Sequence, residues 1–363
     1  MALNIGILGL PNVGKSTLFN ALTASQAEAS NYPFCTVEPN VGVVQVPDDR
    51  LQRLNALLNP DKCTATTIRF VDIAGLVRGA SRGEGLGNRF LHTVREADAL
   101  IHVLRCFADD DVAHVEGDVD PLRDIDTIET ELLLADLEAV ERALPRLEKV
   151  VQTQPQAPER AELQVLHQAR EGLARGVPVR SLELEPEAVK ALRGHHLLTS
   201  KPMLYVTNIH EDDLPEGGAS TAAVAAAVGT DRVLPVAAQI ESEVVQLSLE
   251  ERQEFLSALG LEKTGMERLI LAGYELLNLI TFYTMAHAKL QAWQLPRGTT
   301  AARAAGRIHS DMESGFIRAE VVSSDELLST GSMTAVREKG RVRTEGRDYL
   351  IADGDVVHFL FKA

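Results

Sequence analysis

The segment GLPNVGKS at residues 9–16 has the spacing of a phosphate-binding loop, and this feature restricts the fold of the chain most strongly. An apolar run at 4–8 predicts a strand before it, and STLFNALTA predicts a helix after it. In such a loop the glycines let backbone N–H groups turn toward phosphates, and the helix N-terminus adds the positive end of its dipole. We therefore predict that Lys15 reaches the β- and γ-phosphates and that the Ser16 hydroxyl binds Mg²⁺.

The apolar runs along the chain predict an α/β fold with a mainly parallel sheet. Strand patterns occur at 4–8, 41–46, 67–71, 99–104, 202–207 and 233–237. Between about 121 and 196, apolar residues recur at helical spacing, and TQPQAPER separates two such stretches. This predicts a helical hairpin inserted between strands; the alternative is that the two helices only cover a face of the sheet.

The pattern becomes rich in strands in the last part of the chain. The segments ITFYTM, KLQAWQL, GFIRAEVV and DVVHFLF predict strands, and PRGT and ADGD predict turns. We therefore expect a nucleotide domain at 1–277, carrying the helical insertion, and a compact β-rich domain at 278–363.

Charge and cysteine content limit the possible environments of the chain. The net charge of −16 argues against binding of nucleic acid across the whole protein surface. Residues 278–363 hold 11 basic and 10 acidic residues, against 25 and 42 upstream, so the terminal domain is the part that could lie against RNA. The scattered cysteines Cys35, Cys63 and Cys106 and the lack of a long apolar run predict a soluble cytoplasmic protein that does not enter a membrane.

Residues downstream of the phosphate loop predict a metal site and a nucleotide switch. The strand at 67–71 leads into the segment DIAG, which places the Asp72 carboxylate near the metal and the Gly75 N–H near a γ-phosphate. In NYPFCT, Thr36 offers a second hydroxyl to the metal. The glycine-rich segment LVRGASRGEGLGN can change conformation at low cost, although it can also be an inert loop.

The segment NIHE at 208–211 lies where guanine-specific nucleotide hydrolases carry Asn-Lys-x-Asp. In those enzymes the aspartate accepts two adjacent N–H groups of guanine, and adenine lacks that donor pair. Glu211 is one methylene longer, Ile209 can pack on either purine, and Asn208 can reach N7. We therefore expect ATP to be favoured over GTP; the alternative is a GTPase that tolerates this variant.

Taken together, GLPNVGKSTLFNALT, NYPFCT, DIAGLVRGASRGEGLGN, HVEGDVDP, NIHE and YLIADGDVVHFLF resemble the YchF family, also called Obg-like ATPases, over nearly the whole chain. The resemblance implies a Ras-like core, a helical insertion and a C-terminal TGS domain of β-grasp shape. It also implies binding of ATP in preference to or alongside GTP, and association with ribosomes. The nucleotide-binding residues it implies are Asn12, Val13, Gly14, Lys15, Ser16, Thr17, Asn208, Ile209 and Glu211, with Mg²⁺ near Ser16 and Thr36.

Three further residues bear on catalysis. Leu76 stands where many related GTPases place a water-orienting glutamine, which predicts slow basal turnover. His114, in HVEGDVDP, is our candidate for positioning the water, and the alternative is a structural loop histidine. Asn12 resembles the residue that holds K⁺ in cation-activated relatives; otherwise it is a turn residue.

We therefore predict a monomeric, ATP-driven switch that acts on the ribosome, with the large subunit and its rRNA as the expected partners. A non-catalytic adaptor that uses nucleotide as a structural ligand is a second possibility, because Leu76 leaves the water without a glutamine. A small-molecule kinase also fits the phosphate-loop motif, but the pairing of DIAG with NIHE disfavours it.

Overall fold

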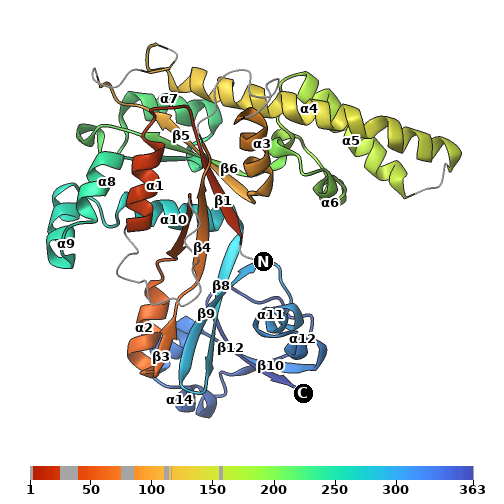
Figure 1. The fold of residues 1–363 in the computed structure, drawn as a ribbon. Helices are drawn as coiled ribbons and strands as arrows, with labels where there is room; N and C mark the ends of the chain where they lie inside the picture. The colour runs from red at the N-terminus through yellow and green to blue at the C-terminus, as the bar shows by residue number, and fades with distance from the viewer. Residues whose placement is uncertain are drawn as a thin grey trace. The chain divides into compact units, whose positions relative to one another are not determined.

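A computed structural model describes residues 3–24, 40–74, 86–109, 114–115, 117–154 and 158–362. The chain forms two compact units: Met1–Val43 with Arg69–Leu269, and Val44–Ile68 with Ile270–Ala363. Figure 1 colours the chain from its N-terminus to its C-terminus. Each unit has its own six-stranded sheet, so each is described separately.

The first unit is built on a sheet with the strand order β2-β4-β1-β5-β6-β7 (Figure 1). These strands are β1 (Asn4–Leu8), β2 (Val41–Gln45), β4 (Thr67–Asp72), β5 (Ala99–Arg105), β6 (Met203–Asn208) and β7 (Val233–Val236). β1 pairs in parallel with β4 and β5, and β6 pairs in parallel with β5 and β7. All residues of β5 and β6 are buried, as in a parallel sheet covered on both faces. The predicted α/β fold is confirmed.

The helices of this unit outside the insertion are α1 (Lys15–Ala24), α3 (Leu86–Glu96), α7 (Gly218–Val228), α8 (Ala238–Val244) and α9 (Leu249–Ala258). The boundary between the two units falls within α10 (Gly265–Leu276). α1 contacts β1 and α8, α3 contacts β1, and α7 contacts β7. α1 and α8 therefore pack against each other.

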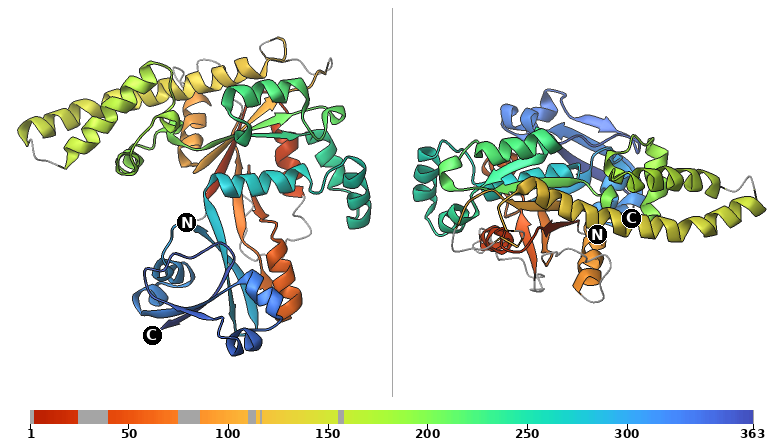
Figure 2. Two further views of the ribbon diagram at one scale, coloured as in Figure 1. Left: turned by 180° about the vertical axis from the view of Figure 1, so that it is seen from behind. Right: turned by 90° about the horizontal axis from the view of Figure 1, so that it is seen from above.

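The insertion consists of α4 (Pro121–Thr153), α5 (Glu159–Ala174) and the shorter α6 (Pro186–Leu192). The Asp120 carboxylate caps α4 by accepting from two N–H groups of the first turn, and Pro121 suits that turn because it lacks an N–H. The first part of the insertion contacts β5 and α7, whereas Val140 and Leu144 pack against Leu166 of α5. The helices therefore both cover the sheet and form a hairpin that extends beyond it (Figure 2). Part of the predicted turn, 155–157, lies outside the described residues.

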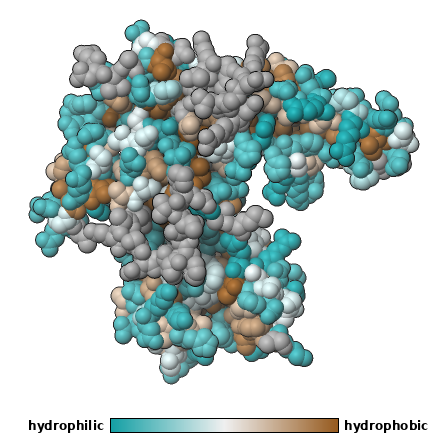
Figure 3. Space-filling view, viewed as in Figure 1, coloured by the Kyte–Doolittle hydropathy of each residue, from teal (hydrophilic) through white to brown (hydrophobic). Residues whose placement is uncertain are grey.

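The surface of the hairpin that Figure 3 displays is mainly hydrophilic, with isolated apolar side chains. Leu134 of α4, for example, is 37% exposed. Among the helices of the described ranges, none combines the length and the apolar composition that crossing a membrane requires.

The second unit holds a mixed sheet with the order β11-β10-β12-β8-β9-β3. Its strands from the C-terminal part of the chain are β8 (Leu279–Ala286), β9 (Lys289–Pro296), β10 (Phe316–Ser323), β11 (Arg343–Glu345) and β12 (Asp355–Phe361). β8 and β9 form an antiparallel hairpin, and the last strand, β12, lies parallel to β8. The alanines of α11 (Ala301–Ile308) pack on one face against Phe282 and Phe359. This is the expected β-grasp arrangement, accompanied by α12 (Ser310–Ser314), α13 (Ser324–Thr330) and α14 (Met333–Glu338).

Residues 44–68 pack with the C-terminal unit, although the expected division places them in the nucleotide domain. They form α2 (Asp49–Leu58) and β3 (Lys62–Thr64), and β3 pairs in parallel with β9. Leu51 and Leu54 of α2 are buried against Tyr283, whose hydroxyl donates to Asp48 at 2.7 Å. Burial of this apolar helix face explains why the segment joins the second sheet.

Candidate nucleotide-binding site

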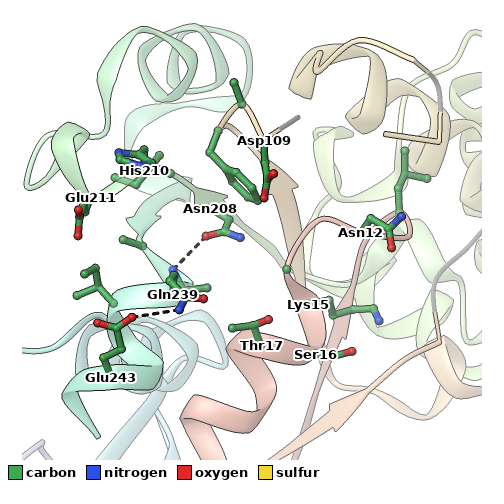
Figure 4. Close-up of a pocket in the computed structure, with 18 of the residues that line it drawn as sticks. Asn12, Lys15, Ser16, Thr17, Asp109, Asn208, His210, Glu211, Gln239 and Glu243 are labelled. Carbon is green, nitrogen blue, oxygen red and sulfur yellow. Dashed lines mark hydrogen bonds between the residues drawn. The ribbon is translucent and has the colours of Figure 1, made fainter. Parts of the chain in front are cut away.

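The loops that follow β1, β5, β6 and β7 meet at one edge of the first sheet. Leu8 lies beside His102, Arg105 beside Asn208, and Asn208 beside Val236, so parallel strands end together. Ligand sites of open α/β sheets form at this edge. Here the loops enclose an open cavity of about 1080 Å³ (Figure 4). Its lining residues are Leu10, Pro11, Asn12, Gly14, Lys15, Ser16, Thr17, Phe107, Ala108, Asp109, Asn208, Ile209, His210, Glu211, Ala237, Ala238, Gln239, Ile240 and Glu243.

The phosphate loop has the backbone shape that the motif predicts. Asn12 has φ 63° and Gly14 has φ 90°, in the left-handed region that asparagine and glycine tolerate. A Cβ on Gly14 would collide with the side-chain amide of Asn208. Gly14 is therefore required both for its backbone conformation and for the close approach of β6. α1 begins directly after it at Lys15, so the N-terminus of the helix faces the cavity.

Lys15 and Asp72 form an ion pair beside the phosphate loop, with 3.2 Å between Lys15 Nζ and Asp72 Oδ1. Their side chains are 11% and 17% exposed, so the pair is little screened by water. Asp72 is the last residue of β4, as the sequence predicts. Thr36 and Gly75, the other two residues predicted for the metal and the γ-phosphate, lie outside the described residues.

The site fits Mg²⁺ through oxygen donors. Ser16 places a hydroxyl in the cavity wall, and the Asp72 carboxylate lies at the same loop. Across the described ranges, His, Cys, Asp and Glu side chains form no cluster of three or more that could hold a metal alone. This donor set suits Mg²⁺, which commonly combines few protein ligands with substrate phosphates and water.

Asn208 connects three segments of the site. Its side-chain Nδ2 donates to the carbonyl oxygen of Val13 at 3.0 Å, and its Oδ1 accepts from the N–H of Ala238 at 3.0 Å. The residue is 4% exposed. Sequence reasoning expected Asn208 to reach N7 of the base; in the structure its amide holds the phosphate loop and the start of α8 in place. Val13, also predicted as a nucleotide-binding residue, contributes to the site through this carbonyl group.

The other end of the cavity carries the predicted base-reading residues. Ile209 is buried and lines the cavity, and Glu211 lines it from the short helical turn after β6. Figure 4 shows Glu211 on one side of Asn208 and Lys15 on the other. We call the part of the cavity near Glu211, the predicted base-reading residue, the base end, and the part near Lys15 the phosphate end.

Several lining residues were not identified from the sequence, among them Phe107, Asp109, Gln239 and Glu243. The first two follow β5, and the other two lie at the start of α8, directly after β7. Their position after parallel strands is the signal that could have identified them, because side chains at these strand ends gather at one edge.

Arg105 fixes the loop after β5. It is 1% exposed, and its guanidinium donates to the carbonyl oxygens of Phe107 at 3.2 Å and Asp109 at 3.0 Å. The same group lies 4.8 Å from the centre of the Phe107 ring, within the range of a cation–π contact. One buried cation thus sets the backbone of a cavity wall.

His114 lies outside the cavity lining. Its Nε2 is 3.0 Å from Asp124 Oδ2 at the beginning of α4, and both side chains are 1% exposed. Burial raises the pKa of Asp124, while the contact with His114 opposes that shift. Leu76 and residues 110–113 lie outside the described residues. The structure therefore places His114 in a buried pair with Asp124, outside the described lining of the cavity.

Two family models match the chain. Residues 4–137 match a model described as "50S ribosome-binding GTPase", and residues 279–362 match YchF-GTPase_C, which is described as a "protein of unknown function". The first match contains the phosphate loop together with residues 44–68 of the second unit, and the second match covers the C-terminal strands of the second sheet.

Curated relatives match over the full length. The chain is 49% identical to "Ribosome-binding ATPase YchF" of Bacillus subtilis, covering 99% of this chain and 100% of the relative. It is 47% identical to the protein of that name from Escherichia coli O157:H7, covering 99% of each. The solved structure of the Schizosaccharomyces pombe YchF GTPase superposes with a TM-score of 0.88 at 34% identity, covering 99% of this chain and 97% of that one. The chain therefore belongs to the YchF family.

Proposed function

We propose that this chain is a Mg²⁺-dependent ATPase that acts as a nucleotide-controlled switch on the ribosome. The observation that carries the proposal is the single cavity that joins Lys15 and Ser16 at one end to Glu211 at the other. The name "Ribosome-binding ATPase YchF" of full-length relatives supports it.

The phosphate end supplies charge and backbone donors. The N-terminus of α1 and the N–H groups of the loop face the phosphates, and Lys15 exchanges its contact with Asp72 for the β- and γ-phosphates. Ser16, with Asp72 close by and Thr36 as a further hydroxyl, would hold Mg²⁺. Bound Mg²⁺ neutralises charge on the phosphate oxygens. We further propose that the Gly75 N–H senses the γ-phosphate and that Asn12 holds K⁺ near the phosphates.

The base end does not select guanine, because Glu211 does not reproduce the short aspartate that contacts guanine, and ATP is the proposed substrate. GTP remains a second candidate substrate, because one matching family model and the fission yeast relative are both named for GTPase activity. Hydrolysis is slow without an activator, since Leu76 cannot hold the attacking water.

We keep His114 as the proposed water-positioning residue, with Asp124 orienting its ring through the 3.0 Å contact. Unchanged single-turnover hydrolysis in His114→Ala would remove the residue from the mechanism and leave it a structural role at the start of α4.

The ribosome partner rests mainly on the names of the relatives. The nearly neutral segment 278–363 is the part of an otherwise acidic chain that can approach rRNA of the large subunit with little repulsion. We propose that the chain works as a cytoplasmic monomer, with the nucleotide domain at 1–277 controlling the TGS domain at 278–363.

Paired calorimetric titrations of the full chain with Mg·ATP and Mg·GTP test the proposal. We expect tighter binding of ATP, and multiple-turnover phosphate release that falls to background in Lys15→Ala. Tight uptake of GTP without measurable heat from ATP would contradict the ATP assignment. Equal phosphate release by wild type and Lys15→Ala would point to an adaptor that does not hydrolyse nucleotide.

Co-sedimentation with ribosomes tests the switch. The amount of chain that pellets with large subunits should differ between a non-hydrolysable ATP analogue and ADP. The same amount with both nucleotides would argue against control by nucleotide, whatever the hydrolysis rate.

A further inference from the structure

Gln239 and Glu243 lie one helical turn apart on α8, and both line the base end of the cavity. Gln239 Nε2 donates a hydrogen bond to Glu243 Oε1 at 3.1 Å, drawn as a dashed line in Figure 4. The figure places this pair on the same side of Asn208 as Glu211. The base end is therefore bordered by two carboxylates and one primary amide.

The contact with Glu243, an i,i+4 hydrogen bond between two exposed side chains, favours one orientation of the Gln239 amide. A carboxylate can only accept hydrogen bonds, so it requires the nitrogen of the amide to face it. The carbonyl oxygen of Gln239 is then turned away from Glu243 as an acceptor. The neighbouring backbone donor, the N–H of Ala238, is already engaged by Asn208 Oδ1. At this border Glu211, Glu243 and the Gln239 carbonyl oxygen present acceptors, beside the second N–H of Gln239 and the ring of His210.

The two purines differ in the group that such a border recognises. Adenine carries an amino group at position 6, which donates, and guanine carries an oxo group, which accepts. Glu211 does not separate them, because its carboxylate can accept from the adenine amine as well as from the N–H groups of guanine. Glu211 lacks the paired contact with guanine, which explains why ATP is tolerated. A preference for ATP over GTP needs a further group that disfavours the 6-oxo group of guanine.

We propose that Gln239, held in orientation by Glu243, is a specificity-determining residue that accepts a hydrogen bond from the 6-amino group of adenine and disfavours a 6-oxo purine. This inference rests on the proposed function, since it assumes a purine triphosphate in this cavity. The oxo group would face a carbonyl oxygen and lose its partner, whereas the amine gains one. Where the bound purine covers Gln239, two carbonyl oxygens that face each other without a donor lower affinity about tenfold.

Four nucleotides separate the effect of position 6 from that of position 2. ITP has the 6-oxo group without the 2-amino group of guanine, and 2-amino-ATP has the 6-amino group together with the 2-amino group. Calorimetry on the full chain should give tighter binding of ATP and 2-amino-ATP than of ITP and GTP, by about tenfold. If the affinities instead divide according to the group at position 2, with ATP and ITP on one side and 2-amino-ATP and GTP on the other, the inference is overturned. The selectivity would then be assigned to Glu211.

Two variants test the residue directly. Gln239→Ala removes the acceptor, so the ratio of the ITP and ATP dissociation constants should fall from about ten toward one. Gln239→Lys replaces the acceptor by a donor, so the ratio should fall below one. Glu243→Gln releases the orientation of the amide and should give an intermediate ratio. Because each ratio is measured within one variant, a general loss of folded protein does not change it.

Gln246→Ala and Glu250→Gln are matched controls, because they change the same residue types just beyond α8, outside the cavity lining. Both should keep the wild-type ratio. An unchanged ratio in Gln239→Ala and Gln239→Lys would overturn the inference while leaving the ATPase proposal intact. Failure of the wild type to bind any of the four triphosphates would instead refute the proposed function itself.

Discussion

The side-chain amide of Asn208 donates to the carbonyl oxygen of Val13 at 3.0 Å, which ties the end of β6 to the phosphate loop. The approach is close enough that a Cβ on Gly14 would collide with the same amide. Through its second contact, with the Ala238 N–H, Asn208 also fixes the start of α8. The phosphate end and the base end of the cavity thus share one buried side chain.

Asn208→Ala should weaken the binding of ATP and GTP by a similar factor. The substitution removes two buried hydrogen bonds that shape the loop, worth about 2 kcal/mol together, which is roughly 30-fold in affinity. Calorimetry with both nucleotides measures the two changes. A loss confined to ATP would show that Asn208 reads the base instead of holding the loop. Asn55→Ala, at an exposed position of α2, is the control and should change neither value.

Hydrolysis should run faster in K⁺ than in Na⁺ at equal ionic strength, by about tenfold, because a cation at Asn12 would stabilise charge that develops between the β- and γ-phosphates. Asn12→Gly removes the amide but preserves the backbone, since glycine adopts φ 63° without strain. Phosphate release by this variant should be equal in the two salts. Equal rates for the wild type would refute a K⁺ site at Asn12.

His102 should make stability depend on pH. Its ring is fully buried on β5, its nitrogens lack hydrogen-bond partners among the described residues, and burial, aided by the positive charge of Arg180, lowers its pKa from 6.5 to about 3. As pH falls below about 6.5 the unfolded chain therefore takes up the proton first, so stability that is complete above this pH is lost toward pH 3. The loss amounts to about 1.4 kcal/mol per pH unit.

His102→Phe removes this titration and keeps a ring of similar size beside Tyr205. Urea unfolding at pH 8 and pH 5 should show the variant gaining about 2 kcal/mol relative to wild type at the lower pH. His92→Phe, an exposed histidine on α3, should leave the pH dependence unchanged. If the free energy of unfolding changes with pH in the same way in wild type and His102→Phe, His102 takes up its proton equally in the folded and unfolded states.

Asp136→Ala should destabilise the first unit by about 3 kcal/mol, because it leaves buried N–H and hydroxyl donors without an acceptor. The carboxylate, 2% exposed on α4, accepts from the Leu198 N–H at 2.8 Å and from the N–H and hydroxyl of Thr199 at 2.7 Å each. These bonds attach the hairpin to the segment that leads into β6. Urea denaturation measures the effect, and Glu138→Ala, an exposed residue two positions along the same helix, should show little change. Similar midpoints for the two variants would contradict an anchoring role.

The parts of the fold that the sequence predicts well are those decided by local pattern. The apolar runs of β5 and β6 identify buried parallel strands, and the glycines and lysine of the phosphate loop identify its function without knowledge of any distant contact. The hairpin follows in the same way from the helical spacing of its apolar residues. Each of these patterns lies within a short stretch of sequence, so it can be recognised without knowledge of distant contacts.

What the sequence does not predict depends on partners far away in the chain. β3 pairs with β9, more than 200 residues later, so its membership of the second sheet has no local signal. The amide of Asn208 is engaged by Val13, 195 residues earlier, which the motif alone does not reveal. Gln239 was missed for the same reason, because its place at the base end depends on where β7 ends relative to β6.

The buried guanidinium of Arg105 has a consequence for nucleotide exchange. Because it already grips the carbonyl oxygens of Phe107 and Asp109, this wall of the cavity is shaped before any ligand arrives. A purine entering there spends little of its binding energy on ordering the chain, and one leaving does not have to wait for the wall to unfold. The residence time of the nucleotide would then depend on the phosphate end of the cavity. There Lys15 must break its contact with the phosphates and form its ion pair with Asp72 again.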